Sequence, residues 1–168
     1  MLHNPPSLVS SILVLLSAAA LLAASLHDVI GRTVPNWMAG ILALSGLGLR
    51  AADGHLPGGI VAGVIVFAGA ALCWRYRLMG GGDVKLLAAT AIVVPPGAVP
   101  TFIAAVALAG GALALLYLAG RHRVGRPRTK RPHGLLARVL RVERWRIYRG
   151  GPLPYACAIA AGGLFVLL

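Results

Sequence analysis

Six apolar stretches, separated by short polar breaks, are the dominant pattern along the chain. The stretches cover residues 8–26, 36–50, 58–74, 84–97, 99–119 and 152–168. The hydrophobic core of a single soluble domain could not bury so many uncharged runs. A transmembrane helix needs about 20 predominantly apolar residues, which is close to the length of the longer runs. The second and fourth stretches are short for a full span. The pattern predicts an all-α, polytopic transmembrane helical bundle of six spans, forming one membrane-embedded domain over residues 1–168.

The boundary between the fourth and fifth stretches depends on the sequence Pro95-Pro96-Gly97. Proline removes a backbone donor and glycine permits a tight turn, so this sequence predicts a hairpin. The uncharged run 86–119 is too long for one helix and slightly short for two. For residues 8–26 the alternative is a cleaved signal peptide, but the run exceeds a usual signal core and no Lys or Arg precedes it.

Composition points to the bilayer as the solvent of this chain. Hydrophobic residues make up 58% and charged residues 12% of the 168 positions, whereas about a quarter of a soluble domain is charged. The formal net charge is +12, and eleven of the sixteen Lys and Arg residues lie between Arg121 and Arg149. This clustering between two apolar stretches is typical of a cytoplasmic loop beside anionic lipid. We therefore expect membrane lipid, and no nucleic acid, as a partner.

The loops also predict the orientation of the chain in the membrane. With six spans, the polar segments 27–35, 75–83 and 120–151 share one side. Together with Lys85, just inside the fourth span, that side carries fifteen of the sixteen bases. The positive-inside rule makes that side cytoplasmic and places the N-terminus outside. In the basic cytoplasmic loop 120–151, apolar residues alternate with arginines. The loop is therefore either an interfacial helix with Trp145 and Tyr148 at headgroup depth or a solvated basic segment.

The two candidate catalytic acids are Asp28, which closes the first span, and Asp83, which opens the fourth. A carboxylate at the membrane edge costs free energy because a charge lies close to hydrocarbon. Its presence there therefore suggests a functional role. Two such groups brought together share a proton near neutral pH, and the pair can activate water for peptide hydrolysis without a metal. The alternatives are a proton path in a small proton-coupled transporter and simple anchoring of the helix ends at the membrane interface. In a third alternative, a membrane scaffold whose basic loop docks a partner, both acids would be dispensable.

The residues around Asp83 strengthen the enzyme hypothesis. The sequence is Met79-Gly80-Gly81-Gly82-Asp83-Val84-Lys85, and its glycines allow an extended peptide to approach closely. A helix N-cap would explain one glycine and the acid, but not three glycines together with Lys85. A phosphate loop is excluded because G-K-[ST] is absent. On the other side, Asp28 is followed by Arg32 and by Val34-Pro35-Asn36, a turn and helix start.

These two motifs, together with Pro154-Tyr155-Ala156-Cys157-Ala158-Ile159-Ala160-Ala161-Gly162, resemble the type IV prepilin peptidase family of G-x-G-D aspartyl proteases. Val34 replaces the usual Ile, and Ala156 stands where the family often has Gly. The resemblance extends over nearly the whole chain. It implies that Asp28 and Asp83 are the catalytic residues. It further implies that the site-shaping or substrate-binding residues are Gly80, Gly82, Lys85, Arg32, Pro35 and Asn36.

The resemblance implies an aspartic endopeptidase of type IV pilus systems that cuts the basic leader from prepilin-like protein substrates at the cytoplasmic face of the prokaryotic plasma (inner) membrane. Bifunctional members carry a large insert with paired C-x-x-C motifs and also N-methylate the new terminus. This chain has about ten polar residues between its first two spans and no such cysteines. We therefore expect a peptidase without methyltransferase activity, as in short members of tight-adherence (Flp) pili. Archaeal preflagellin peptidases remain an alternative.

The remaining polar and small residues have simpler interpretations. Cys73 and Cys157 each stand alone in an apolar stretch and are expected to be small buried side chains. The five histidines show no metal-ligand spacing, so neither a metal nor another cofactor is expected. Asp53 and His55, beside Arg50, are expected to be solvated. Paired small residues, such as those at 160–163, predict close helix packing.

Overall fold

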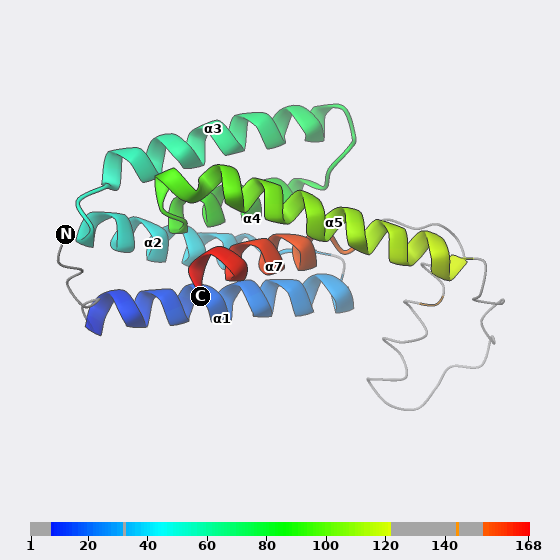
Figure 1. Ribbon diagram of the computed structural model, residues 1–168, viewed down its shortest axis with the longest axis horizontal. Coiled ribbons are helices and arrows are strands. Elements are labelled where there is room, and N and C mark those ends of the chain that lie inside the picture. The colour runs from blue at the N-terminus through cyan, green and yellow to red at the C-terminus, as the bar shows by residue number, and fades with distance from the viewer. Residues whose placement is uncertain (1–7, 32, 122–143, 145–152) are drawn as a thin grey trace.

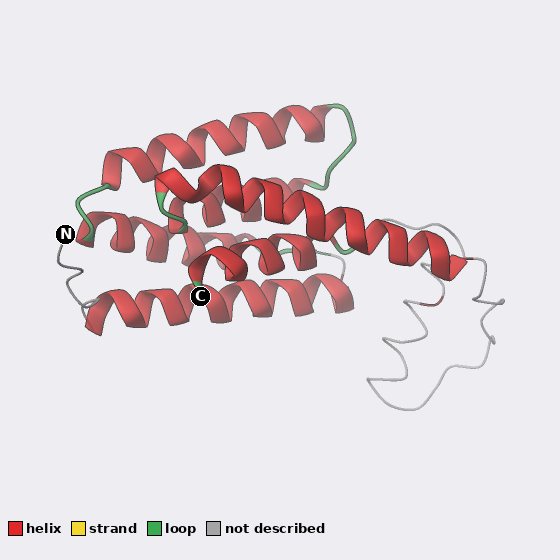
Figure 2. Ribbon diagram, in the orientation of Figure 1, coloured by secondary structure: helices red, strands yellow, loops and turns green. Residues whose placement is uncertain are grey.

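The computed structural model describes residues 8–31, 33–121, 144 and 153–168, and the regular structure in these residues is helical (Figure 2). The helices are α1 (Leu8–Gly31), α2 (Asn36–Ala52), α3 (Leu56–Arg75), α4 (Gly81–Val93), α5 (Val99–Arg121) and α7 (Tyr155–Leu167), with a 3-10 turn η1 (Pro96–Ala98) before α5. The predicted all-α class is confirmed for the described part of the chain.

Prolines determine where several of these helices begin and end. Pro35 and Pro154 directly precede α2 and α7, and Pro57 lies in the first turn of α3, where the missing N–H costs no intrahelical hydrogen bond. Val94 is extended, with φ −70° and ψ 139°, because the proline that follows disfavours the helical conformation. The predicted break between the fourth and fifth stretches therefore lies at Pro95.

The six helices lie side by side and alternate in direction (Figure 1). α4 packs against α2, α3 and α7, and α7 also packs against α1 and α5. Residues 86–91 of α4 are all buried. A helix that is apolar on every side is typical of an interior position, and α4 is the central helix of the bundle.

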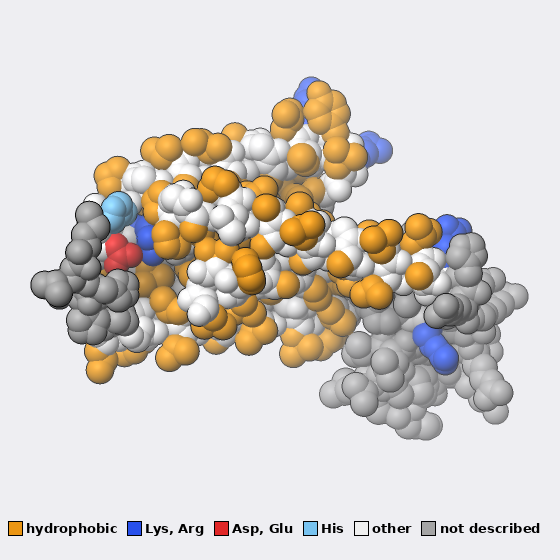
Figure 3. Space-filling view, viewed as in Figure 1, with side chains coloured by type: hydrophobic (Ala, Val, Ile, Leu, Met, Phe, Trp, Pro, Cys, Tyr) orange, Lys and Arg blue, Asp and Glu red, His pale blue; other side chains and the backbone are white. Residues whose placement is uncertain are grey.

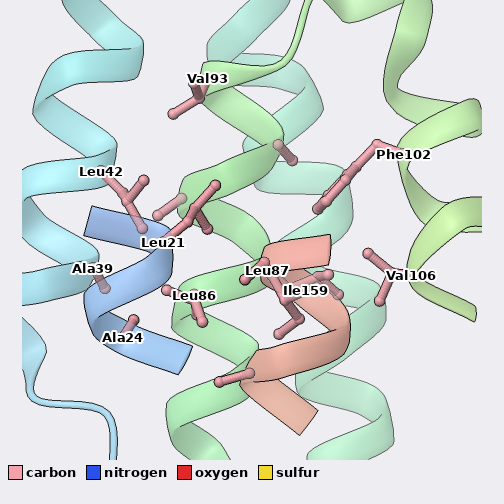
Figure 4. Close-up of a cluster of buried hydrophobic side chains, with 14 of the residues drawn as sticks. Leu21, Ala24, Ala39, Leu42, Leu86, Leu87, Val93, Phe102, Val106 and Ile159 are labelled. Carbon is pink, nitrogen blue, oxygen red and sulfur yellow. The ribbon is translucent and has the colours of Figure 1, made fainter. Parts of the chain in front are cut away.

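The core is built from side chains of all the helices around α4 (Figure 4). Its largest fully buried apolar side chains are Phe102, Leu21, Leu42, Leu86, Ile159, Val93 and Val94. Glycines bring two pairs of backbones close together: a Cβ atom would lie 2.8 Å from Val93 N at Gly46 and 2.8 Å from Val106 N at Gly162. Close packing through small residues, as predicted for 160–163, is present between α5 and α7.

The outer surface of the bundle is apolar. Leu15, Val64 and Leu108 are among many large apolar side chains that are mostly exposed, and in Figure 3 such side chains cover the flanks while the charged ones gather at the ends. Within the described part of the chain, three segments are long and apolar enough to cross a membrane: Leu8–Gly31, Leu56–Arg75 and Pro96–Arg121. An apolar surface of this extent is typical of a protein that contacts lipid.

The sequence prediction for the opposite end of the bundle is confirmed, since Asp53 and His55 are exposed. Their neighbour Arg50, by contrast, is only 5% exposed. Its aliphatic chain packs on Gly59 of α3, and its guanidinium Nη2 lies 3.1 Å from Asp53 Oδ2. A long side chain can bury its methylenes while its charge finds a partner. The predictions for loop 120–151, including an interfacial helix, fall almost wholly outside the described residues.

Candidate active site

The two predicted catalytic acids lie at the same end of the bundle. Asp28 is in the last turn of α1 and Asp83 in the first turn of α4, and both side chains are half-buried. Since neighbouring helices alternate in direction, the ends of α1 and α3 and the starts of α4 and α7 meet there (Figure 1). Two acids distant in sequence thus become neighbours through the antiparallel packing.

A cavity of about 750 Å³ opens at this end between α1, α3, α4 and α7. Its lining residues are Asp28, Cys73, Arg77, Leu78, Met79, Gly80, Asp83, Leu153, Pro154 and Tyr155. Both acids therefore face one space, which is lined by apolar side chains, one cation and one phenol. The volume falls within the range of about 300–1,000 Å³ that is usual for ligand pockets.

The local backbone holds the Asp83 side chain in place. Gly80 is the extended residue just before α4, and Asp83 is the third residue of the helix. The Asp83 carboxylate accepts a hydrogen bond from the backbone N–H of Gly80, as the acidic residue of a capping box does. A Cβ atom at position 80 would lie 2.9 Å from Asp83 Oδ2. A methyl group at position 80 would therefore displace the carboxylate.

The electrostatics of the site favour a protonated carboxyl group. Asp83 lies just before the apolar stretch 84–97. Burial, and secondly the negative charge of Asp28, raise the pKa of Asp83 from 3.8 to about 6, while the hydrogen bond from Gly80 opposes the rise. Two acids that interact in this way release their protons as a coupled pair. Such a pair can hold one proton close to neutral pH, as general acid–base chemistry requires.

Three other predicted site residues gather at the start of α2 and do not line this cavity. Pro35 directly precedes α2, and Asn36 is the first residue of that helix. Lys85 Nζ donates a hydrogen bond of 2.9 Å to Asn36 Oδ1, which ties the start of α2 to the first turns of α4. Lys85 does not line the cavity with the two acids. It lines a separate apolar groove of about 620 Å³ between α2, α3 and α4.

The last two predicted residues differ in what the structure shows of them. At Gly82 a Cβ atom would lie 3.3 Å from the Cβ atom of Val34, so this glycine lets α4 approach the segment before α2. Arg32 lies outside the described residues. The structure therefore brings Asp28, Gly80 and Asp83 into one cavity, and places Gly82, Lys85, Pro35 and Asn36 around the neighbouring start of α2.

Several residues of the cavity wall were missed by sequence reasoning. Cys73 was expected to be buried, but it is half-buried and faces the cavity. Tyr155 belongs to the C-terminal motif, which could have indicated it, but the motif assigns it no role. For Arg77, no signal was available in the sequence.

Arg77 has an unusual backbone conformation. Its φ is +58°, in the left-handed region that favours glycine. Leu78 N donates to Cys73 O at 3.0 Å, and Arg77 N donates to Trp74 O at 2.9 Å. This pair of hydrogen bonds is the Schellman arrangement that ends many helices. The end of α3 therefore directs a cationic residue to the cavity wall.

Comparison with known proteins supports a hydrolytic site. Among the described residues, no three His, Cys, Asp or Glu side chains gather as a metal site would require. No curated protein and no solved structure matches the chain. The sequence model of the type IV leader peptidase family matches residues 15–115, which include both acids and most of the cavity wall. This match covers more than half of the chain, and the chain therefore belongs to the type IV leader peptidase family.

Proposed function

We propose that the protein is an aspartic endopeptidase that removes the leader peptide of prepilin-like proteins, with Asp28 and Asp83 as its catalytic pair. The observation that carries this proposal is the shared cavity, in which the charge of Asp28 acts on the carboxyl group of Asp83. Membership of a leader peptidase family supports peptide-bond hydrolysis as the reaction. Prepilin-like proteins are the substrate class implied by the resemblance of both aspartate motifs.

The mechanism uses one ionised and one protonated carboxyl group. The ionised carboxylate takes a proton from water as the water oxygen adds to the scissile carbonyl carbon, and the protonated carboxyl gives its proton to the carbonyl oxygen. The tetrahedral intermediate then collapses and the C–N bond breaks. The leaving nitrogen takes the proton that came from water, and the other proton returns to the second carboxyl. Asp83 is the group that keeps a proton closer to neutral pH.

We place this site at the cytoplasmic face of a six-span protein whose N-terminus is outside. The acids lie at the end of the bundle where α1 ends and α4 begins (Figure 1), and by sequence fifteen of the sixteen bases belong to that end. α4 has 13 residues and is about 20 Å long, which is shorter than the hydrocarbon core of about 30 Å. We place it as an interior span surrounded by longer helices.

The proposal also includes the domain organisation, partners and location. Residues 1–168 form a single peptidase domain, and the basic loop 120–151 lies against anionic lipid of the plasma membrane. The substrate is a membrane-anchored precursor whose basic leader lies in the cytoplasm. The short segment between α1 and α2 supports a peptidase without methyltransferase activity.

The test is cleavage by the full chain reconstituted in lipid nanodiscs with a prepilin-like substrate. Leader removal is followed by gel shift and mass spectrometry. Asp28→Asn and Asp83→Asn should each abolish cleavage. The protein should still insert, because an amide side chain costs less free energy in the membrane than a charged one. Asp53→Asn is the matched control at the opposite end, and it should cleave like the wild type.

Cleavage that survives in the Asp28→Asn, Asp83→Asn double variant would contradict the proposal. The transporter alternative would instead be supported by a proton flux into proteoliposomes that requires both acids and occurs without any cleavage.

A further inference from the structure

Tyr155 is a polar residue in the wall of the cavity that holds the two acids. It is the first residue of α7 and follows Pro154, which is buried. Both residues line the cavity with Asp28 and Asp83. The phenol lies close enough to Asp83 and to Cys73 for both to interact with it electrostatically. The phenol is therefore, with the two acids and Arg77, one of the polar groups that line the space where we place the substrate.

The ring of Tyr155 is held by helix α5. Gly110 of α5 is buried, and a Cβ atom there would lie 3.0 Å from Cε2 of the ring and 3.5 Å from both Cζ and the hydroxyl oxygen. The glycine leaves space for the ring edge that carries the hydroxyl. Tyr155 also packs against the hydrophobic core. A ring supported on one side by a helix backbone and on the other by the core keeps its hydroxyl in a defined position.

The hydroxyl is available to a ligand. No residue in the described part of the chain forms a hydrogen bond with it. A tyrosine hydroxyl near neutral pH is protonated and can donate one hydrogen bond. A neutral donor beside two carboxyl groups can stabilise additional negative charge on a substrate oxygen without giving up its own proton. Preorganised donors of this kind are a large source of rate enhancement in acyl transfer.

We propose that the Tyr155 hydroxyl donates a hydrogen bond to the carbonyl oxygen of the scissile peptide bond. This hydrogen bond stabilises the negative charge that develops on the same oxygen while water adds and before the carboxyl proton is fully transferred to it. This inference rests on the proposed function. The phenol keeps its proton throughout, so the proton transfers between water, substrate and the two carboxyl groups remain as described above. Tyr155 then contacts the reacting atoms, while Gly110 is a positioning residue that acts through the ring.

The test measures kcat and KM for leader removal by the full chain in nanodiscs. Tyr155→Phe removes the hydroxyl and keeps the ring, so the packing against α5 is retained. Loss of one oxyanion donor lowers kcat by about 10²- to 10³-fold, and we expect this loss with little change in KM. Tyr76→Phe is the matched control because Tyr76 is 68% exposed and does not line the cavity. It should leave both constants unchanged.

A second variant tests the position of the ring. Gly110→Ala pushes the ring by a few tenths of an ångström and should lower kcat in the wild-type background. It should have little further effect in the Tyr155→Phe background, because the hydroxyl that it displaces is already absent. Equal effects in the two backgrounds would mean that Gly110 acts through packing alone and would overturn the proposed positioning.

The outcomes separate this inference from the proposed function. Wild-type kcat in Tyr155→Phe, while Asp83→Asn is inactive, would overturn the role of Tyr155 and leave the catalytic pair intact. A rise in KM without a fall in kcat would also overturn it, since the hydroxyl would then bind the substrate without stabilising the transition state. Cleavage that persists in Asp83→Asn would overturn the proposed function itself.

Discussion

Gly80→Ala is the change that tests most directly how the site is built. The substitution adds a single methyl group at the residue before α4. Its Cβ atom would lie 2.9 Å from Asp83 Oδ2, whereas ordinary van der Waals contact begins at 3.4 Å. The backbone of Gly80 has φ −73° and ψ 145°, which alanine adopts without strain. The methyl group therefore disturbs the carboxylate and not the chain path.

The expected size of the effect follows from this contact. The carboxylate has to retreat by about 0.5 Å, and a misplacement of about 1 Å costs a reaction about 10²-fold. The movement also weakens the hydrogen bond from the Gly80 N–H, which holds the carboxylate at the start of α4. We expect kcat/KM to fall by about 10- to 100-fold. Alanine is also a poorer N-cap than glycine, and the fold should lose no more than about 1 kcal/mol.

Leader cleavage in nanodiscs and thermal unfolding in detergent are measured on the same preparations. The matched control is Gly69→Ala in α3, where a Cβ atom meets no atom within 4 Å and alanine favours the helix. It should keep full activity. Full activity in Gly80→Ala would refute the reasoning, because the carboxylate would then tolerate displacement. Loss of activity together with a collapse of thermal stability would show that Gly80 acts on the fold.

Three further predictions concern the charges and the thiols of the site. Burial raises the pKa of Asp83 from 3.8 to about 6, so ionisation of this carboxyl group destabilises the folded state as pH rises from about 4 to about 6. Asp83→Asn should therefore raise the melting temperature relative to wild type at pH 7–8 and much less at pH 4. An equal gain at both pH values would contradict the raised pKa. The dependence of kcat/KM on pH should be bell-shaped, with both limbs belonging to the coupled pair of Asp28 and Asp83, and EDTA should leave the profile unchanged; loss of activity that added metal restores would overturn the mechanism. A bulky maleimide should react with Cys73, which lines the cavity, and block cleavage. Cys73→Ser should make cleavage insensitive to the maleimide. Cys157→Ser should leave the block in place, because Cys157 lies between α1 and α7 in contact with Ser25.

The sequence predicted the helices well because their ends carry strong local signals. Proline before α2 and α7, and the proline pair after α4, mark boundaries that depend on backbone sterics alone. The association of Asp28 with Asp83 was also predictable, since both acids interrupt apolar stretches at the same end of an alternating bundle. The helix boundaries thus have a local cause, and the association of the acids follows from the number of spans.

The wall of the cavity was not predictable in the same way. Cys73 and Tyr155 face the acids because of the rotation of α3 and α7 about their own axes, and that rotation is decided by packing against other helices. In uniformly apolar helices the sequence carries little periodicity to reveal it. The burial of Arg50 has a similar origin, since it depends on a glycine of the next helix.

The left-handed backbone of Arg77 has a practical consequence for work with this protein. A side chain in that region costs about 1–2 kcal/mol relative to glycine, and the greater freedom of glycine in the unfolded chain offsets about 0.5–1 kcal/mol of that cost. Arg77→Gly should therefore make the protein more stable by roughly 0.5–1 kcal/mol. The same change removes the cation from the cavity wall. Selection for thermal stability, as is usual when membrane proteins are prepared for crystallisation, would favour this substitution and would yield a robust protein with an altered substrate cavity.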